Sequence, residues 1–456
     1  MNRTSPPVRA AGFAAATLLL LAPAIWNGFP LTFYDTGAFV EQAATGNFVA
    51  ERSVFYSWFL KLFQYQVSLW IPVIAQAALT VWVMGEFARL VSPSLAPERA
   101  PGRFLLIVLA LCIGTGLPWY AGQVLADIFA PLMVLCLYLL GFHFRALDWP
   151  RRAAMLAIVA LAATSHASHL GLLGGLAAVA VLALPLARRT RLRVEWKPAA
   201  LAFALSLALI VASNFARTGE AFFSRAGSAF VFARLLQDGI VKRLLDDTCP
   251  ASGYVLCVYK DKLPPSANEW LWASDSPFWK LGDFAGTEAE SRSIIADSLR
   301  RYPLMHLKTA AIATAEQLVT FATGDGIEPQ ALLWGIFEKY IPDQFAAYKA
   351  ARQQNEEISF VWINPMHIAL GGLSYLALAS VLIMAARRPV ADWDDKLWLP
   401  AYLFAALLGN AFICGVLSNQ HDRYQSRLIW MASFAVLLLA ARRGENAGAE
   451  SIPRTA

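Results

Sequence analysis

Residues 169–215 read HLGLLGGLAAVAVLALPLARRTRLRVEWKPAALAFALSLALIVASNF, two apolar runs on either side of a gap that holds five of the chain's 38 Lys and Arg residues. Each run is long enough to cross most of a bilayer about 30 Å thick at about 1.5 Å per residue. Positive charge stays on the cytoplasmic side during membrane insertion. The stretch therefore predicts two spans joined by a cytoplasmic loop.

The same alternation runs through the rest of the chain. Nearly every second gap between apolar runs is basic, and the intervening gaps hold few or no positive charges: Arg3, Arg9; Arg89, Arg99, Arg103; Arg145, Arg151, Arg152; Arg188, Arg189, Arg191, Arg193, Lys197; Arg387, Arg388, Lys396; Arg442, Arg443. The apolar runs predict spans near 11–30, 68–88, 104–118, 124–142, 152–166, 169–186, 199–215, 366–386, 397–417 and 426–441. About ten spans place both termini in the cytoplasm.

Composition agrees with this fold class. The chain is 57% hydrophobic and only 15% charged, with a mean hydropathy of +0.48, which argues against a soluble globular domain. We predict an all-α polytopic protein of a bacterial-type inner (plasma) membrane. The net charge of +6 is spread over short loops, so membrane orientation explains it and no nucleic-acid partner is expected.

The first apolar run has two interpretations. Basic residues precede AGFAAATLLLLAPAIW, and Ala22-Pro23-Ala24 has the small-x-small pattern of a signal-peptide cleavage site. The apolar character continues to Phe33, which is long enough for a span. We favour a retained helix, and either interpretation leaves Asp35 outside.

The spans divide the chain into three parts. Residues 1–215 hold about seven spans and a first outer loop, 31–67, in which DTGAFVEQAATGNF predicts a short interfacial helix. Residues 216–365 form a large extracytoplasmic region between spans seven and eight, and residues 366–456 hold about three spans and a cytoplasmic tail. The interruption SHASH requires a tight hairpin between 152–166 and 169–186. Residues 302–324 predict an amphipathic helix on the domain or membrane surface.

Cys249 and Cys257 flank the polar stretch CPASGYVLC in the outer region. Disulfides persist outside the cytoplasm, so we expect these two residues to be bridged.

Two acids are candidates for catalysis at the outer face. Asp35, in FPLTFYDTGAFVEQ, lies where a general base would be needed, although it could equally cap the helix that follows. Asp127, in WYAGQVLADIFAPLMVL, lies just within the fourth predicted span, where an ionisable group is costly. It would either supply a second acid to the same cavity or bond to Gln123 or nearby backbone.

Basic residues near the outer face are candidates for binding phosphate. Arg423 and Arg427 lie four apart on one predicted helix face, next to His421 and Asp422, and would either bind a lipid phosphate or snorkel beside an Asp422 ion pair. Arg52 would bind phosphate, pair with its neighbour Glu51 or anchor the helix end.

His166 and His169 have i,i+3 spacing, which suits one metal or phosphate ligand. The alternative is that both residues cap the predicted hairpin and face water.

Several of these features together resemble the C-type (GT-C) membrane glycosyltransferases. They are the first-loop acid Asp35, an interfacial helix, the basic and aromatic stretch ERSVFYSWFLKLF (51–63), and Arg423-Tyr424 in SNQHDRYQSRLIWMASFAVLLL (418–439). Many members have paired acids in the first loop and a proline-rich stretch before the second span, where this chain has Asp-Thr-Gly and ERSVFYSW.

The resemblance implies transfer of a hexosyl or pentosyl group from a polyprenyl-phosphate donor to an envelope glycan, lipid or protein. Asp35 would be the base, Asp127 would assist or orient, and Arg52, Arg423 or Arg427 would hold the phosphate. A divalent metal stays open, with His166, His169 and His421 as possible polar or metal ligands. Two alternatives are a transporter or flippase of a lipid-linked intermediate, and an envelope-polymer ligase or polymerase. The sequence holds no P-loop, nucleophile elbow or zincin motif.

Overall fold

The computed structural model describes residues 5–190 and 194–450, with backbone only for 395–396 and 442–450. Within these residues the chain is all-α, apart from two isolated β-bridges. Arg3, Arg191 and Arg193 of the predicted cytoplasmic charge pattern lie outside the described residues.

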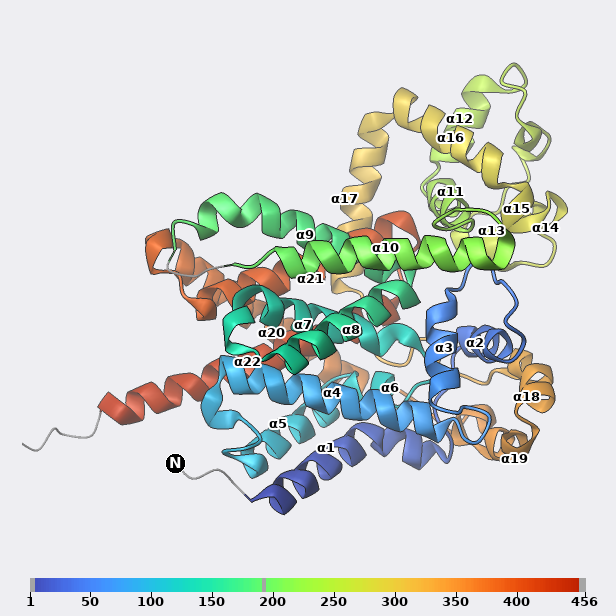
Figure 1. The fold of residues 1–456 in the computed structure, drawn as a ribbon. Coiled ribbons are helices and arrows are strands. Elements are labelled where there is room, and N and C mark those ends of the chain that lie inside the picture. Colours follow the sequence, from blue (N-terminus) through green and yellow to red (C-terminus); the bar gives the residue numbers. More distant parts are fainter. Residues whose placement is uncertain (1–4, 191–193, 451–456) are drawn as a thin grey trace, which may run out of the picture.

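Seven helices are long and apolar enough to cross a membrane. They are α1 (Pro6–Asn27), α4 (Trp70–Val91), α9 (Ala167–Ala187), α10 (Lys197–Thr218), α20 (Asn364–Ala386), α21 (Asp395–Leu417) and α22 (Asp422–Glu450). Figure 1 shows the start of α1 and the far end of α22 at one end of the bundle, and the smaller helices at the other end. The chain is therefore a helical, polytopic membrane protein.

Three predicted spans form shorter helices. α5 (Pro101–Gly114) and α7 (Phe129–Phe142) have 14 residues each, and α8 (Trp149–Ser165) has 17. Residues 115–128 between α5 and α7 are irregular, with only the short helices α6 (Leu117–Ala121) and η2 (Ala126–Ile128). The predicted limit 104–118 is thus wrong at its end, because α5 stops at Gly114 and Gly116 and Pro118 disfavour its continuation. The apolar helix Ala126–Phe142 agrees with the span predicted near 124–142.

The irregular stretch is covered by other protein groups. The Gln76 side chain donates to the carbonyls of Ala121 and Gln123, at 3.0 and 2.6 Å. Backbone hydrogen bonds also join Leu31 to Gly122 and Val124, at 3.0 and 2.8 Å. Non-helical backbone within a membrane protein needs such partners, since lipid offers none.

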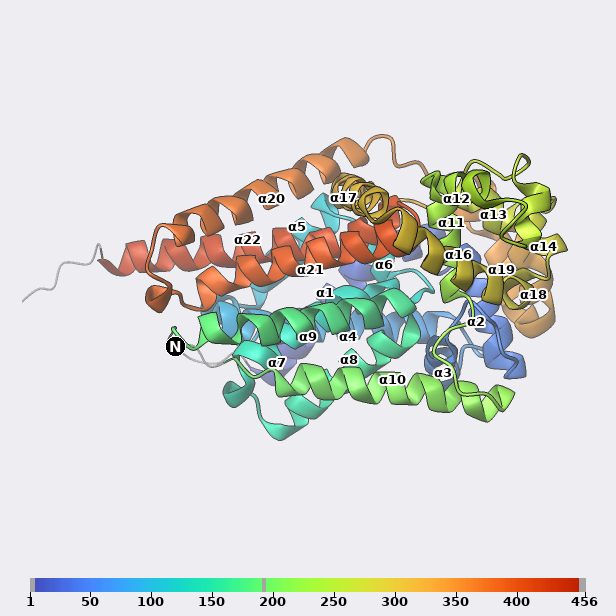
Figure 2. The same cartoon turned by 90° about the horizontal axis from the view of Figure 1, so that it is seen from above.

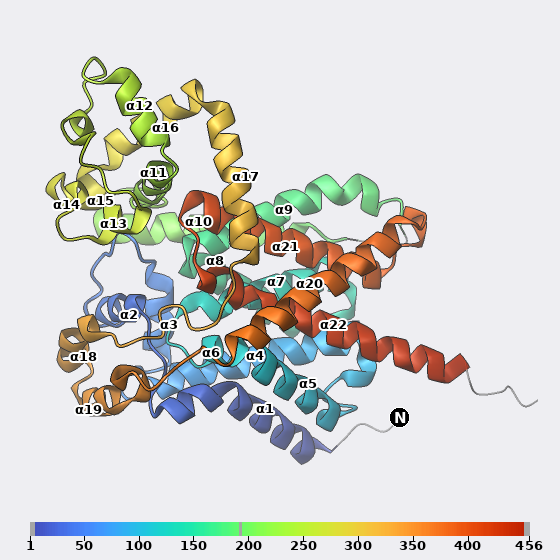
Figure 3. The same cartoon turned by 180° about the vertical axis from the view of Figure 1, so that it is seen from behind.

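The first outer loop and a later segment pack together. α2 (Tyr34–Thr45) and α3 (Val54–Leu62) lie beside α18 (Trp334–Tyr340) and α19 (Pro342–Ala350) in Figures 1 and 3. Gln344 of α19 donates to the Tyr65 carbonyl at 2.8 Å and accepts the Leu69 amide at 2.7 Å. Residues 51–63 form the separate short helix α3, which ends at Leu62, and α4 begins at Trp70, close to the predicted start of the second span.

A second hydrophobic core lies in residues 227–301. Its helices are α11 (Gly227–Gln237), α12 (Ile240–Thr248), α13 (Ala267–Trp272), α14 (Pro277–Lys280), α15 (Asp283–Gly286) and α16 (Glu288–Arg301). Phe232, Trp270 and Phe278 are buried at its centre. Cys249 and Cys257 are joined here by a disulfide, with their Cα atoms 5.6 Å apart.

α17 (Pro303–Val319) connects this subdomain to the bundle and runs across the direction of the long helices (Figures 1 and 3). It packs against α21, where a Cβ atom on Gly415 would lie 2.7 Å from the Ala313 carbonyl oxygen. Glycine thus permits the close approach of these two helices. Ala313 and Gln317 of α17 are buried, whereas Leu304, Leu307 and Val319 are exposed. The helix α17 covers residues 303–319 of the predicted stretch 302–324.

Candidate functional site

Four segments that lie far apart in the sequence place charged side chains in one cluster. Arg52 precedes α3, Asp35 is in the first turn of α2, Asp127 is in η2, and Arg423 and Arg427 are in the first turns of α22. We call these five residues the charged cluster. The cluster lies at the end of the bundle that carries α2 and α3 (Figure 1).

The ion pairs of the cluster form a chain. Arg52 Nη2 lies 2.5 Å from Asp35 Oδ1, and Arg427 Nη1 lies 2.7 Å from Asp127 Oδ1. Arg423 lies between the two carboxylates, with Nη2 at 4.0 Å from Asp35 Oδ2 and Nη1 at 3.8 Å from Asp127 Oδ2. These longer separations exceed hydrogen-bond distance. Arg423 is therefore attracted by both acids without being bonded to either.

The cluster is largely closed to solvent. The side chains of Arg427, Asp127, Asp35 and Arg423 are 0%, 2%, 5% and 8% exposed, while that of Arg52 is 16% exposed. Arg423 Nη1, Asp127 Oδ2 and Arg427 Nε are buried and have no hydrogen-bond partner among the described residues. Buried polar groups normally have partners, so the two guanidinium N–H groups can still donate to an oxygen-rich ligand or water, and Asp127 Oδ2 can still accept from a hydroxyl group or water.

The local fold explains where Asp35 points. Phe33 is the N-cap residue of α2, its amide donates to Thr36 Oγ1 at 2.9 Å, and Thr36 Oγ1 donates to the Val124 carbonyl at 3.0 Å. The alternative that Asp35 caps this helix is therefore wrong. The Asp35 carboxylate does not accept the hydrogen bond that caps α2, and it faces the guanidinium groups of Arg52 and Arg423.

Asp127 lies in η2, which continues directly into α7, so it lies just within the apolar helix Ala126–Phe142, as predicted for the fourth span. The alternative of a bond to Gln123 is wrong, because the Gln123 side chain donates to the Thr32 carbonyl at 3.4 Å. Asp127 instead bonds to Arg427. For Arg52, Nη1 donates to the Glu51 backbone carbonyl at 2.9 Å while Nη2 bonds to Asp35.

Arg427 is held by side chains of two further helices, α9 and α21. Its Nη2 donates to Ser168 Oγ at 3.2 Å and to Asn410 Oδ1 at 3.3 Å, and it lies 3.7 Å from Cys414 Sγ. Arg423 stacks over the Phe33 ring at 4.2 Å. The positions of the two guanidinium groups are thus fixed by protein contacts, which is the preorganisation that binding an anion requires.

The two histidines form the turn between α8 and α9. His166 Nδ1 accepts the Ser168 amide at 3.2 Å as the N-cap of α9, and His169 Nδ1 contacts the Ala162 carbonyl at 3.0 Å. The predicted tight hairpin is present, and His166 caps α9. His169 is fully buried, so the alternative that it faces water is wrong. Ser168 connects this turn to Arg427. No group of three or more His, Cys, Asp or Glu side chains in the described part of the chain can hold a metal ion.

A second acid and histidine lie at the edge of the cluster. Asp325 Oδ2 lies 3.5 Å from His421 Nδ1 and accepts the Arg423 amide at 3.1 Å. Burial alone would raise the pKa of the Asp325 carboxyl group. Hydrogen bonds from His421 and from the Arg423 amide lower this pKa by more than burial raises it, so it lies below its usual value. Asp422 accepts the Ala322 amide and so does not form the predicted ion pair with the arginines.

Sequence reasoning did not single out Asp325 or Glu328. Both lie in TGDGIEPQ (323–330), a turn between α17 and α18. Tyr34 donates its hydroxyl to Glu328, and burial, with the bond to Glu328, raises the Tyr34 pKa to about 12. Two glycines around an acid were the available signal, but the outer region holds many acids in turns.

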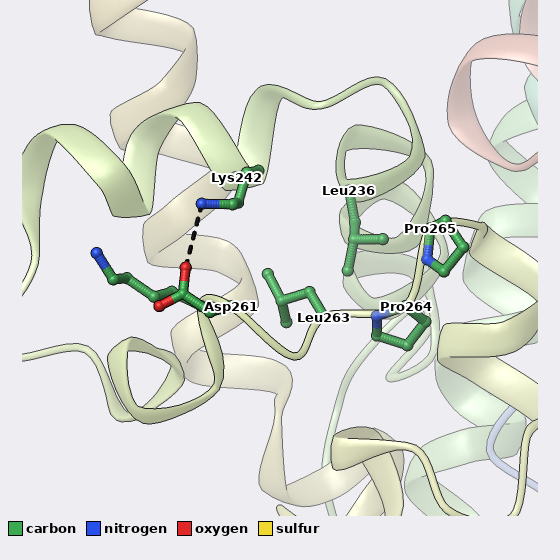
Figure 4. Close-up of a pocket in the computed structure, with 7 residues that line it drawn as sticks. Leu236, Lys242, Asp261, Leu263, Pro264 and Pro265 are labelled. Atoms are coloured by element: carbon green, nitrogen blue, oxygen red, sulfur yellow. Dashed lines mark hydrogen bonds and ion pairs between the residues drawn. The ribbon is translucent and has the colours of Figure 1, made fainter.

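A separate cavity of about 310 Å³ lies in the subdomain with the disulfide (Figure 4). Lys242, Asp261 and Pro264 line it, and Lys242 Nζ lies 3.5 Å from Asp261 Oδ1. None of the charged-cluster residues lines this cavity.

The fold and the cluster together define a class: a polytopic helical membrane protein with a buried Asp–Arg cluster at one end of its bundle. No protein-family model, no curated protein and no solved structure matches the chain.

Proposed function

We propose that this protein is an integral membrane glycosyltransferase of the GT-C type, with about ten spans and an extracytoplasmic active site at the charged cluster. It would move a sugar from a polyprenyl-phosphate donor to an envelope acceptor. The observation that carries the proposal is the convergence of two fixed arginines and two acids from distant segments. The residues of the sequence resemblance, Asp35 and Arg423, lie 4.0 Å apart at their nearest charged atoms.

The chemistry of such a donor suits the arginines. When the bond between the anomeric carbon and the phosphate oxygen breaks, a phosphodiester with one negative charge becomes a monoester that carries more. Guanidinium groups that are already in place stabilise this growing charge. Arg423 is the favoured contact, because its Nη1 can bond a phosphate oxygen without breaking a hydrogen bond.

Asp35 and Asp127 would have different roles. The acceptor oxygen bonds to the anomeric carbon while its proton passes to a carboxylate. Asp35 is the candidate for this base, because its carboxylate lies beside Arg52 and Arg423, and Arg423 is the favoured contact for the phosphate. Asp127 bonds to Arg427 and would act as a positioning residue for the guanidinium groups.

The test is transfer by purified protein reconstituted in vesicles with labelled polyprenyl-phosphate sugars and an envelope extract as the acceptor source. Asp35→Asn should reduce transfer by ~10²–10⁴-fold, as expected when a general base is lost. Glu41→Gln is the matched control, because it makes the same change on the same helix α2. Full transfer by Asp35→Asn would contradict the mechanism. Movement of an intact lipid-linked sugar without transfer would favour the transporter instead.

A further inference from the structure

An apolar crevice lies at the opposite end of the bundle from the charged cluster. It has a volume of about 130 Å³ and is formed by α7, α9, α10, α21 and the segment before α10. Figure 2 shows α7, α9 and α10 as neighbours. The lining residues lie at the ends of these helices that the charge pattern predicts to be cytoplasmic.

Small side chains create the crevice. Ala180, Ala183 and Ala187 lie on one face of α9, and Ala401 and Ala405 lie on one face of α21. Facing alanines cannot fill the space between two helices, so a hollow remains. Its walls are almost wholly apolar, and three of its four helices are candidate membrane spans. An apolar hollow of this kind excludes water, so a hydrocarbon chain from the surrounding membrane is the matching occupant.

The rim supplies a second observation. Arg188 and Arg189 directly follow Ala187, and Lys197 lies between the lining residues Trp196 and Pro198. Among the described residues, this side of the rim therefore carries three cations and one acid, Glu195. Tryptophan at a crevice mouth is typical of the headgroup level of a membrane.

The connection that leads into α21 has no such excess of positive charge. Arg387, Arg388 and Lys396 are balanced there by Asp392, Asp394 and Asp395. The contrast places an anionic headgroup on the α9–α10 side, where arginines can bond its phosphate.

We infer that this crevice is a binding site for an anionic glycerophospholipid of the cytoplasmic leaflet. One acyl chain lies between α9 and α21, and the phosphate lies against Arg188, Arg189 and Lys197. The inference does not depend on the proposed glycosyltransferase function, because the crevice and the charged cluster share no residue.

The experiment measures phosphatidylglycerol that remains bound after detergent washing, by quantitative lipid extraction and native mass spectrometry. Full-length protein is first equilibrated with vesicles of phosphatidylglycerol and phosphatidylcholine in equal amounts. The wild type should retain more phosphatidylglycerol than phosphatidylcholine. Ala183→Trp, which fills the crevice, should lose it, whereas Leu182→Trp should retain it, because Leu182 is 79% exposed on the outer face of the same helix.

A rim variant keeps the test valid if Ala183→Trp does not fold. Arg188→Gln with Arg189→Gln changes only exposed side chains and should lower the preference for phosphatidylglycerol by about tenfold. The matched control is Arg387→Gln with Arg388→Gln, an exposed pair at the end of α20. Equal retention of the two lipids by the wild type, or an unchanged preference in the Arg188/Arg189 variant, would overturn the inference.

Discussion

Asp127 and Arg427 form a buried ion pair, so removing either charge leaves the other without its partner. Asp127→Leu or Arg427→Met alone should lower the free energy of unfolding by about 3–5 kcal/mol, and the double variant by less than the sum of the two. Chemical unfolding in detergent measures this. Arg292→Met is the control, because its pair with Glu288 is 62% and 24% exposed and should cost under about 1 kcal/mol. Additive costs would show that the pair is not coupled.

Asp325 should give stability a dependence on acid pH. Its pKa is lowered in the folded protein, so its contribution to stability is complete above the unfolded pKa of about 3.9. The contribution is lost as the pH falls through the lower, folded value. The wild type should therefore be more stable than Asp325→Asn near neutral pH, and this difference in stability should disappear below about pH 4. Thermal unfolding at several pH values measures it. A constant difference across this range would contradict it, and Asp275→Asn, an exposed acid, is the control.

The charged residues were accessible to sequence reasoning because few ionisable groups lie near the predicted outer ends of the spans. Asp35, Asp127, Arg423 and Arg427 all stood out for this reason. Their pairing was not predictable, since Asp127 and Arg427 are 300 residues apart and no local rule relates them. Asp325 was missed because an acid in a polar turn is common.

At the scale of elements, the contact between α17 and α21 depends on glycine. Gly415→Ala should destabilise the protein, because the new Cβ would lie 2.7 Å from the Ala313 carbonyl oxygen. Gly372→Ala on α20 meets nothing within 4 Å and should be neutral or stabilising by up to about 1 kcal/mol. Unfolding of both variants in detergent provides the comparison, and equal stability would contradict the tight contact.

Apolar runs predicted where helices occur better than where they end. The hairpin at His166 follows from its interruption by polar residues. The length of the irregular stretch after α5 does not follow from local signals alone, because the carbonyls of Ala121, Gly122 and Gln123 find their partners in the distant residues Gln76 and Leu31. Such tertiary partners let an apolar stretch be irregular.

At the scale of the whole molecule, the charge pattern predicts a definite orientation. Reporter fusions after Phe33, at Ser274 and after Ser418 should report outside, and fusions at Pro97, Pro150 and Thr190 should report inside. The seven long helices alone would place the two termini on opposite sides of the membrane. Both termini lie in the cytoplasm only if the shorter helices α5, α7 and α8 also cross the membrane, and the fusions test this. An inside signal at Ser274 would overturn the arrangement.

The binding of polyprenyl monophosphate to purified protein tests the central claim most directly, because it requires neither the sugar nor the acceptor to be known. The wild type should bind this lipid, and Arg423→Ala should bind it about tenfold or more weakly after losing a charged hydrogen bond to phosphate. Arg300→Ala, which removes a 79% exposed arginine of the outer subdomain, should bind it as the wild type does. No binding by the wild type, or equal binding by Arg423→Ala, would contradict the account.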